Sequence, residues 1–137
     1  MIGKLVVSAL ALGLIVGATS PSFAGGESEK ICAEAQKRYD GMDAEYKAKP
    51  GETPILMYKY NFCPKTMTVK KGTVVRWINV DKRTSHSVWL KEKGDKESER
   101  FFPDESWIMI ADEPGSYPYL CGPHWQQEGM KGTLVVK

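Results

Sequence analysis

The side chains with the most distinctive chemistry lie near the C-terminus. Cys121 precedes His124 by three residues, Met130 follows six residues later, and His86 is the other histidine of the sequence. A cysteine thiolate, two imidazoles and a distant thioether are the donor set of a trigonal type-1 copper site. These residue types and their spacing predict one copper ion held by the four side chains.

Other uses of these residues fit the sequence less well. A nucleophilic cysteine–histidine pair would need an orienting Asn or Asp and an oxyanion hole, and would leave His86 and Met130 without a role. Structural zinc usually takes four Cys or His ligands, and only three are clustered here. A copper enzyme with type-2 or trinuclear centres needs more than two histidines. The remaining alternative is two unrelated loop histidines.

The first 24 residues predict export. Lys4 is followed by an apolar run, Leu5–Val16, and then by Ser22 and Ala24, the small residues that signal peptidase needs. The run is too short to span a membrane, and no later segment resembles a span. We therefore expect residues 1–24 to be removed and the mature protein to be periplasmic.

The mature chain, residues 25–137, has a length that suits one domain. The full sequence has 19 basic and 17 acidic side chains, for a net charge of +2. Because charges of both signs are interspersed, we expect no nucleic-acid partner and no binding to a membrane surface.

The three cysteines are an odd number for an exported protein. Cys32 and Cys63 lie far from the C-terminal cluster and could form a disulfide, which would leave Cys121 as a thiol with another purpose. Three buried free cysteines are the alternative, although an oxidising compartment disfavours them.

A helix is expected in the accessory segment, residues 25–53. Apolar residues recur at steps of three and four over Ile31–Tyr46, and Ser28 is a candidate N-cap. Gly41 lowers helix propensity and can divide the segment into two pieces. We expect it to pack outside the main domain, with partner docking as an open alternative.

Strands are expected throughout residues 54–137. The apolar period there is two, and turn residues separate the runs. The expected strands are Leu56–Phe62, Met67–Val69, Val75–Val80, Ser87–Leu90, Ser106–Ile110, Tyr117–Cys121 and Thr133–Val136. Many short strands without crossover helices predict an all-β Greek-key sandwich or barrel and exclude a parallel α/β fold.

Nearly every residue of Lys91–Arg100 is charged, and both signs occur. This composition predicts a solvated loop. A docking surface is the alternative that the sequence leaves open.

Linked motifs run through residues 54–137. The first part reads Tyr60-x-Phe62-x-Pro64, then Val69-x-x-Gly72-Thr73-x-Val75-x-Trp77-x-Asn79-x-Asp81, and the second reads Pro114-Gly115-x-Tyr117-x-Tyr119-x-Cys121-x-x-His124, ending in Met130-x-Gly132. Together they resemble the cupredoxin family, small type-1 copper proteins of the plastocyanin, pseudoazurin and amicyanin kind. The resemblance implies an eight-strand Greek-key β-sandwich and one-electron transfer, with His86, Cys121 and His124 as the equatorial ligands.

Two residues beside the ligands depart from the family pattern. Ser87 stands where the family has an Asn that ties the two ligand loops together, and Gly122 stands where it has Ser or Thr. Both changes remove hydrogen bonds of the kind that orient metal ligands.

The axial position has two candidates. Plastocyanin-like loops place Met five residues after the histidine and amicyanin-like loops three, whereas Met130 is six residues after His124 and Gln127 is three. Glutamine is a known axial substitute. Lys131-Gly132-Thr133 matches how the last strand begins in these families, so we favour Met130.

The expected function is electron shuttling by a monomer, without enzyme activity. A cytochrome or oxidoreductase would dock transiently near His124, where Trp125 either forms part of the contact or packs over the loop. A copper-trafficking or storage protein is the second hypothesis, and a catalytic or accessory subunit is the third. Trafficking and storage proteins favour Met- or His-rich clusters, and the sequence shows neither enrichment.

Overall fold

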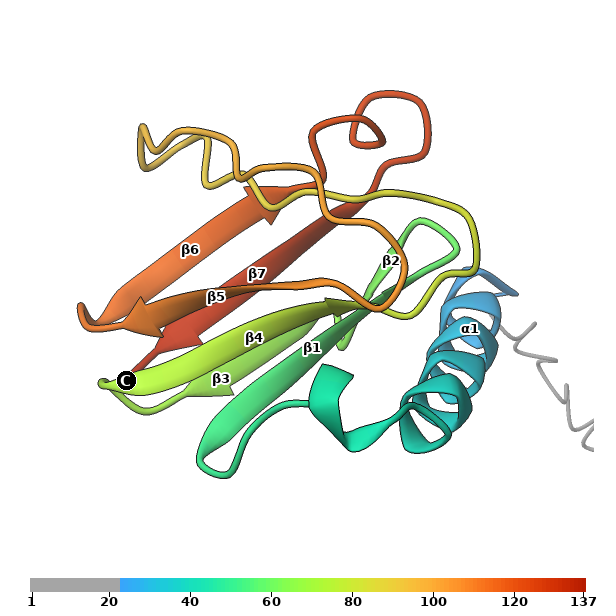
Figure 1. Ribbon diagram of the computed structural model, residues 1–137. Helices are drawn as coiled ribbons and strands as arrows, with labels where there is room; N and C mark the ends of the chain where they lie inside the picture. The colour runs from blue at the N-terminus through green and yellow to red at the C-terminus, as the bar shows by residue number, and fades with distance from the viewer. Residues whose placement is uncertain (1–22) are drawn as a thin grey trace, which may run out of the picture.

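Residues 23–137 are described by the computed structural model, so residues 1–22 of the expected signal peptide lie outside the described part. The chain forms two β-sheets with a helix beside one of them (Figure 1). The elements are α1 (Phe23–Asp40), the 3-10 helix η1 (Ala44–Tyr46), β1 (Glu52–Tyr58), β2 (Asn61–Cys63), β3 (Thr66–Val69), β4 (Thr73–Asn79), β5 (Ser106–Ala111), β6 (Gly115–Leu120) and β7 (Lys131–Val136). Over the described residues, no helix is both long and apolar enough to cross a membrane.

The two sheets form the expected sandwich. One has the strand order β2-β1-β4-β5 and the other β3-β7-β6. The pairs β1–β4 and β3–β7 are parallel, whereas β1–β2, β4–β5 and β6–β7 are antiparallel. The prediction of an all-β sandwich is confirmed, but the described residues form seven strands and not eight.

The strand expected at Ser87–Leu90 is not a continuous one. This stretch makes two isolated bridges, His86 with Phe101 and Trp89 with Leu120. The first partner lies within the same long connection and the second at the end of β6. Because neighbouring residues pair with different segments, no regular ladder can form.

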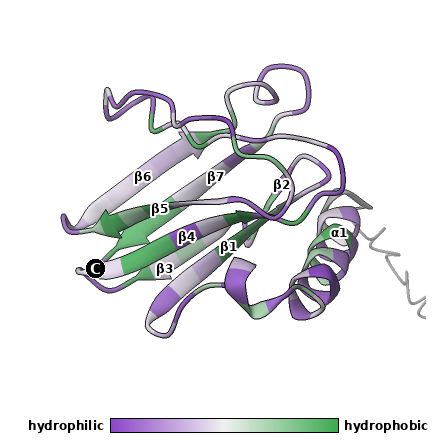
Figure 2. Ribbon diagram, viewed as in Figure 1, coloured by the Kyte–Doolittle hydropathy of each residue, from purple (hydrophilic) through white to green (hydrophobic). Residues whose placement is uncertain are grey.

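Aromatic side chains dominate the core between the sheets. The ring centroids of Phe62 and Tyr119 lie 4.7 Å apart, and those of Trp77 and Tyr119 lie 5.4 Å apart, both edge to face. All three rings are almost fully buried. Hydrophobic residues, drawn in green, occur on the strands of both sheets (Figure 2). Cys121 and Met130 belong to the same buried cluster, so the predicted site is continuous with the core.

Helix α1 packs on the outer face of the β2-β1-β4-β5 sheet. A second buried cluster joins Ala35 of the helix to Leu56, Ile78 and Val80. The expected division near Gly41 is confirmed, since α1 ends at Asp40. The N-cap prediction was wrong: Ser28 lies inside the helix, and its hydroxyl donates to Oδ1 of Asn61 at 3.4 Å.

A tight turn interrupts the strand expected over Leu56–Phe62. Lys59 and Tyr60 have φ values of 44° and 60°, the left-handed conformation that two-residue hairpins require. A salt bridge of 2.8 Å between Nζ of Lys59 and Oε2 of Glu34 links this turn to α1. The sequence did not predict this turn, because the alternating apolar pattern continues through it and neither turn residue is a glycine.

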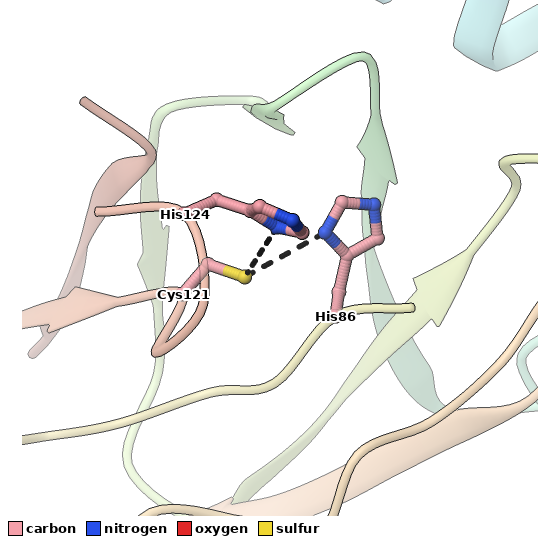
Figure 3. Close-up of side chains that lie close together, drawn as sticks. All are labelled: His86, Cys121 and His124. Carbon is pink, nitrogen blue, oxygen red and sulfur yellow. Dashed lines mark hydrogen bonds between the residues drawn. The ribbon is translucent and has the colours of Figure 1, made fainter. Parts of the chain in front are cut away.

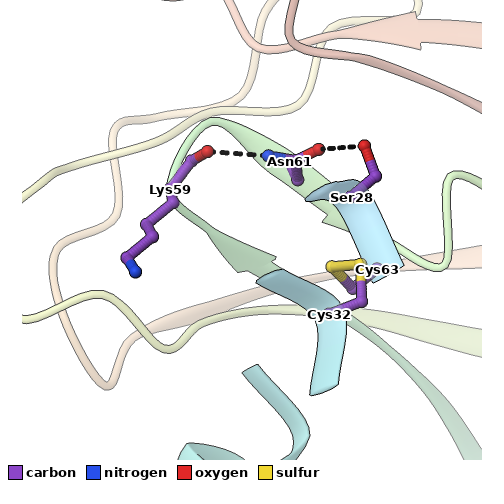
Figure 4. Close-up of a disulfide and its surroundings, with 5 residues drawn as sticks. All are labelled: Ser28, Cys32, Lys59, Asn61 and Cys63. Atoms are coloured by element: carbon purple, nitrogen blue, oxygen red, sulfur yellow. Dashed lines mark hydrogen bonds between the residues drawn. A yellow bond between two sulfur atoms is a disulfide. The ribbon is translucent and has the colours of Figure 1, made fainter. Parts of the chain in front are cut away.

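The predicted Cys32–Cys63 disulfide is confirmed (Figure 4). It joins α1 to β2 across a sequence separation of 31 residues. Cys121 is the free, buried cysteine. The disulfide and the Ser28–Asn61 hydrogen bond both join α1 to β2, and so they fasten the helix to the sandwich.

Removing the disulfide should lower stability. In the metal-free protein, the Cys32→Ala/Cys63→Ala double variant should lose about 3–4 kcal/mol of unfolding free energy, because the open loop gains entropy when unfolded. Guanidinium unfolding measures the loss. Reduced wild-type protein is the control and should match the variant; equal stability of the variant and oxidised wild-type protein would contradict the expectation.

Candidate metal centre

Three potential ligands meet at one end of the sandwich. The donor atoms of His86, Cys121 and His124 all lie within 4.8 Å of one another. Sγ of Cys121 is 3.6 Å from Nδ1 of His86 and 3.4 Å from Nδ1 of His124 (Figure 3). His86 lies in the long connection between β4 and β5, whereas Cys121 directly follows β6. The fold therefore brings together the three residues that the sequence singled out.

His86 is held on both its backbone and its ring. Its backbone exchanges two hydrogen bonds of 3.0 Å with Phe101, and its side chain is fully buried. Nε2 lies 2.6 Å from Oδ2 of Asp81. A carboxylate that accepts from Nε2–H leaves Nδ1 unprotonated and directed toward Cys121, which is the tautomer a metal ligand needs.

Buried Asn79 organises the turn that carries Asp81. Its side-chain amide donates to the carbonyl oxygens of Thr84 at 2.7 Å and Phe101 at 3.1 Å. Its Oδ1 accepts from the backbone N–H of Asp81 at 3.0 Å. Sequence reasoning quoted Asn79 and Asp81 within a motif but gave neither a role. Both residues lie within seven positions before His86, and this closeness in the sequence was the signal that could have pointed to their role.

The loop between Cys121 and Met130 closes on its own backbone. The N–H groups of His124 and Trp125 donate to the Cys121 carbonyl at 3.1 and 2.9 Å. Cys121 N–H donates to the Met130 carbonyl at 3.1 Å, and Met130 N–H donates to the His124 carbonyl at 3.3 Å. This network sets the C-x-x-H turn and brings Met130 back beside Cys121.

Burial distinguishes the two axial candidates. Met130 is fully buried in the cluster that contains Cys121, whereas Gln127 is exposed. An exposed side chain at the tip of the loop is poorly placed to reach a buried sulfur and imidazole. The structure therefore favours Met130 as the fourth member of the site.

The protonation behaviour of the site suits metal binding. Burial raises the pKa of the Cys121 thiol, while the backbone amides of Ser87 and His124 oppose the rise. Burial lowers the pKa of His124, and the adjacent His86 lowers it further. His124 is therefore a neutral imidazole at neutral pH, and metal binding must release the thiol proton.

The donor set fits copper. It combines one soft sulfur with two imidazoles, and no carboxylate is among the three clustered donors. Hard cations such as Mg²⁺ and Ca²⁺ prefer oxygen ligands instead. The buried thioether of Met130 adds a second soft donor to the same end of the core.

Of the two histidines, only His124 is partly exposed, since His86 is fully buried. The ring of Tyr60 lies edge-on to that of His124, with centroids 4.9 Å apart. Sequence reasoning missed this contact because it assigned Tyr60 to a strand. The β1–β2 turn thus covers part of the most accessible ligand.

Two lysines contact the ring of Trp125. The ammonium groups of Lys91 and Lys131 are 4.9 and 5.8 Å from its ring centroid. The ring is half-buried and lines a surface groove with Pro118 and Leu120. Trp125 therefore both packs on the domain and presents a surface next to His124.

Known proteins resemble this chain in sequence and fold. The family model described as copper binding proteins, plastocyanin/azurin family, matches residues 52–137. Amicyanin-alpha of Methylorubrum extorquens is 28% identical over 100 residues, which cover 70% of this chain and 81% of that protein. Plastocyanin of Scenedesmus fuscus is 34% identical over 85 residues, which cover 56% of this chain and 86% of that protein.

A solved structure supports the same grouping. The crystal structure of amicyanin from Paracoccus versutus matches with a TM-score of 0.58 and 26% identity, over 66% of this chain and 86% of that chain. The family match covers more than half of the present sequence and contains the whole cluster of His86, Cys121 and His124. With its donor set and its two-sheet fold, this protein belongs to the plastocyanin/azurin family of copper-binding proteins, the cupredoxins, and its cofactor is copper.

Proposed function

We propose that this protein is a one-electron carrier whose copper is bound by Nδ1 of His86, Sγ of Cys121 and Nδ1 of His124, with Met130 as the weak axial ligand. The meeting of the three donor atoms within 4.8 Å carries the proposal. A bound copper ion supplies a Cu(II)/Cu(I) couple and so exchanges one electron at a time.

The residues of the site suit such a carrier because contacts within the protein hold them in place. Asp81 fixes the ring of His86, and the closed loop fixes the spacing of Cys121 and His124. Ligands that cannot move far require little rearrangement between two oxidation states. The partly exposed edge of His124 is the point of the donor set nearest to a partner.

Burial disfavours the other functions considered. Trafficking and storage need exchangeable ligands, whereas His86, Cys121 and Met130 are fully buried. A catalytic copper needs an open coordination position for its substrate. Relatives named amicyanin and plastocyanin also support a carrier.

We also propose that the protein is exported to the periplasm. Residues 1–24 would be the cleaved signal peptide, residues 25–53 an accessory helical segment and residues 54–137 the copper-binding domain. The Cys32–Cys63 disulfide supports this location, because disulfides persist in oxidising compartments.

The partner is a redox protein, a cytochrome or oxidoreductase, that docks transiently on a monomer. We place the contact at the His124 edge, with Tyr60, Pro123 and Trp125 around it. Each of these side chains is at least partly accessible. Small interfaces of this kind suit brief electron-transfer encounters.

Replacing the thiolate should abolish the intense visible colour. Cys121→Ser should lose the thiolate-to-copper absorption band and keep its far-UV circular dichroism, because the apolar core does not depend on copper. Copper-loaded wild-type protein, cycled with ferricyanide and dithionite, is the control and should bleach reversibly. A variant that stays blue contradicts the ligand assignment, and a wild-type protein that binds only colourless Cu(I) favours trafficking.

The axial assignment predicts different effects at two positions. Met130→Gln should lower the reduction potential, because an amide oxygen stabilises Cu(I) less than the softer thioether does. Gln127→Ala should leave the potential and visible spectrum unchanged, since that side chain is exposed. Voltammetry and absorption spectra measure both. The reverse pattern would identify Gln127 as the axial ligand.

If partners dock at the His124 edge, a positive charge added there should slow electron transfer more than the same charge added elsewhere. Trp125→Lys adds a third positive charge beside Lys91 and Lys131, so two copies that meet by this face repel each other. Electron self-exchange, measured by NMR line broadening, should slow by roughly tenfold at low ionic strength and recover partly in salt. Thr68→Lys adds the same charge on β3, opposite Val135, and should have little effect. Equal slowing by both variants contradicts this docking face.

A further inference from the structure

A carboxylate from the charged segment 91–100 reaches the two backbone positions that follow the ligands. Oε1 of Glu97 lies 2.6 Å from Oγ of Ser87, the residue after His86. The same Oγ accepts the backbone N–H of Gly122, the residue after Cys121, at 2.9 Å. Because the Ser87 hydroxyl has one proton, it donates to Glu97 and accepts from Gly122.

The carboxylate occupies the space that a side chain at position 122 would fill. A Cβ added to Gly122 would lie 1.8 Å from Oε1 of Glu97 and 2.3 Å from its Cδ. The backbone of Gly122 is not in the left-handed region, so its φ angle does not require glycine. Glycine at 122 therefore makes room for Glu97, and any larger residue would displace that side chain.

The chain around Glu97 holds the carboxylate in place. Ser98 N–H donates to the Val88 carbonyl at 2.9 Å, and Ser98 Oγ accepts from Val88 N–H at 2.9 Å. Nε of Arg100 lies 3.8 Å from Oε1 of Glu97. Figure 1 shows this connection, in yellow and orange, folded over the end of the sandwich that carries the ligands. The expectation of a solvated loop at Lys91–Arg100 is confirmed, since every residue except Ser98 is exposed. The Glu97 side chain, 33% exposed, nevertheless turns toward Ser87.

We propose that Glu97 is a positioning residue that ties the His86 segment to the Cys121 loop through Ser87, and that its charge lowers the reduction potential of the site. The expected loss of a connecting hydrogen bond at Ser87 was wrong, because the Ser87 hydroxyl itself joins the two segments by accepting from Gly122 N–H. Glu97 orients that hydroxyl by accepting a hydrogen bond from it. This charge-assisted hydrogen bond is stronger than a neutral one. A nearby negative charge favours the more positive oxidation state of a bound ion.

The carboxylate is close enough to act on the ligand itself. Its Oε1 is hydrogen-bonded to Ser87, which in turn accepts from the residue that directly follows Cys121. Burial is the main cause that raises the pKa of the Cys121 thiol; Arg100 lowers this pKa, and Glu97 raises it by a smaller amount.

Two substitutions separate the charge from the tether. Glu97→Gln keeps an oxygen that accepts from Ser87 but removes the charge, so the potential should rise while the loop stays largely closed. Glu97→Ala removes both, so the potential should rise and the loop should open more often. Glu99→Gln is the matched control, since it removes one charge from an exposed side chain in the same segment.

Loop opening is measured without copper. Cys121 is the single free thiol of the chain, because Cys32 and Cys63 are bridged, so its alkylation in the metal-free protein reports access to the site. Glu97→Ala should be alkylated roughly tenfold faster than wild-type protein. Glu97→Gln keeps a weaker, neutral hydrogen bond, so its rate should lie between those of the wild-type protein and Glu97→Ala. An unchanged rate in Glu97→Ala overturns the tether, and equal potential shifts in Glu97→Gln and Glu99→Gln overturn the specific charge effect.

A double-variant cycle tests the shared space. Gly122→Ala should displace Glu97 and speed alkylation as Glu97→Ala does, and the combined variant should be no faster than either. Additive effects would show that the two positions are independent. The role in potential rests on the proposed copper function, but the alkylation test does not, so failure of one is distinguishable from failure of the other.

Discussion

One backbone bridge holds the two ligand-bearing segments at a fixed distance. Trp89 N–H donates to the Leu120 carbonyl at 2.9 Å, and Leu120 N–H donates to the Trp89 carbonyl at 3.0 Å. His86 lies three residues before one partner, and Cys121 directly follows the other. The bridge joins the long connection to the sheet that contains β6. Together with the Gly122–Ser87 hydrogen bond, it keeps the imidazole of His86 and the sulfur of Cys121 in segments that are joined to each other.

The site combines an apolar interior with a small set of satisfied polar groups. Cys121 and Met130 continue the aromatic core, so the sulfur atoms are shielded from water. On the opposite side, the buried side chains of Asn79, His86 and Ser87 all have hydrogen-bond partners. A buried polar group with a partner costs little and orients its neighbour, whereas an unpaired one is destabilising. The ligands are therefore held in place by the folded protein itself.

The helix α1 lies outside the residues matched by the family model, yet it acts on the edge of the site. The Cys32–Cys63 disulfide and the Lys59–Glu34 salt bridge fasten it to the β1–β2 hairpin. That hairpin presents Tyr60 to the ring of His124. A helix outside the family match thus supports the turn that covers the accessible ligand.

The sequence by itself determined the donor types, the C-x-x-H spacing, the sandwich class and the break near Gly41. These features follow from composition and local period, which a linear chain displays directly. Only the tertiary structure decided the burial of Met130, the support of His86 by Asp81 and the place of Glu97 above Gly122. Each of these features depends on contacts between segments that are distant in the sequence. Hydrogen bonds and packing between distant residues leave no regular pattern in the sequence, so no local period predicts them.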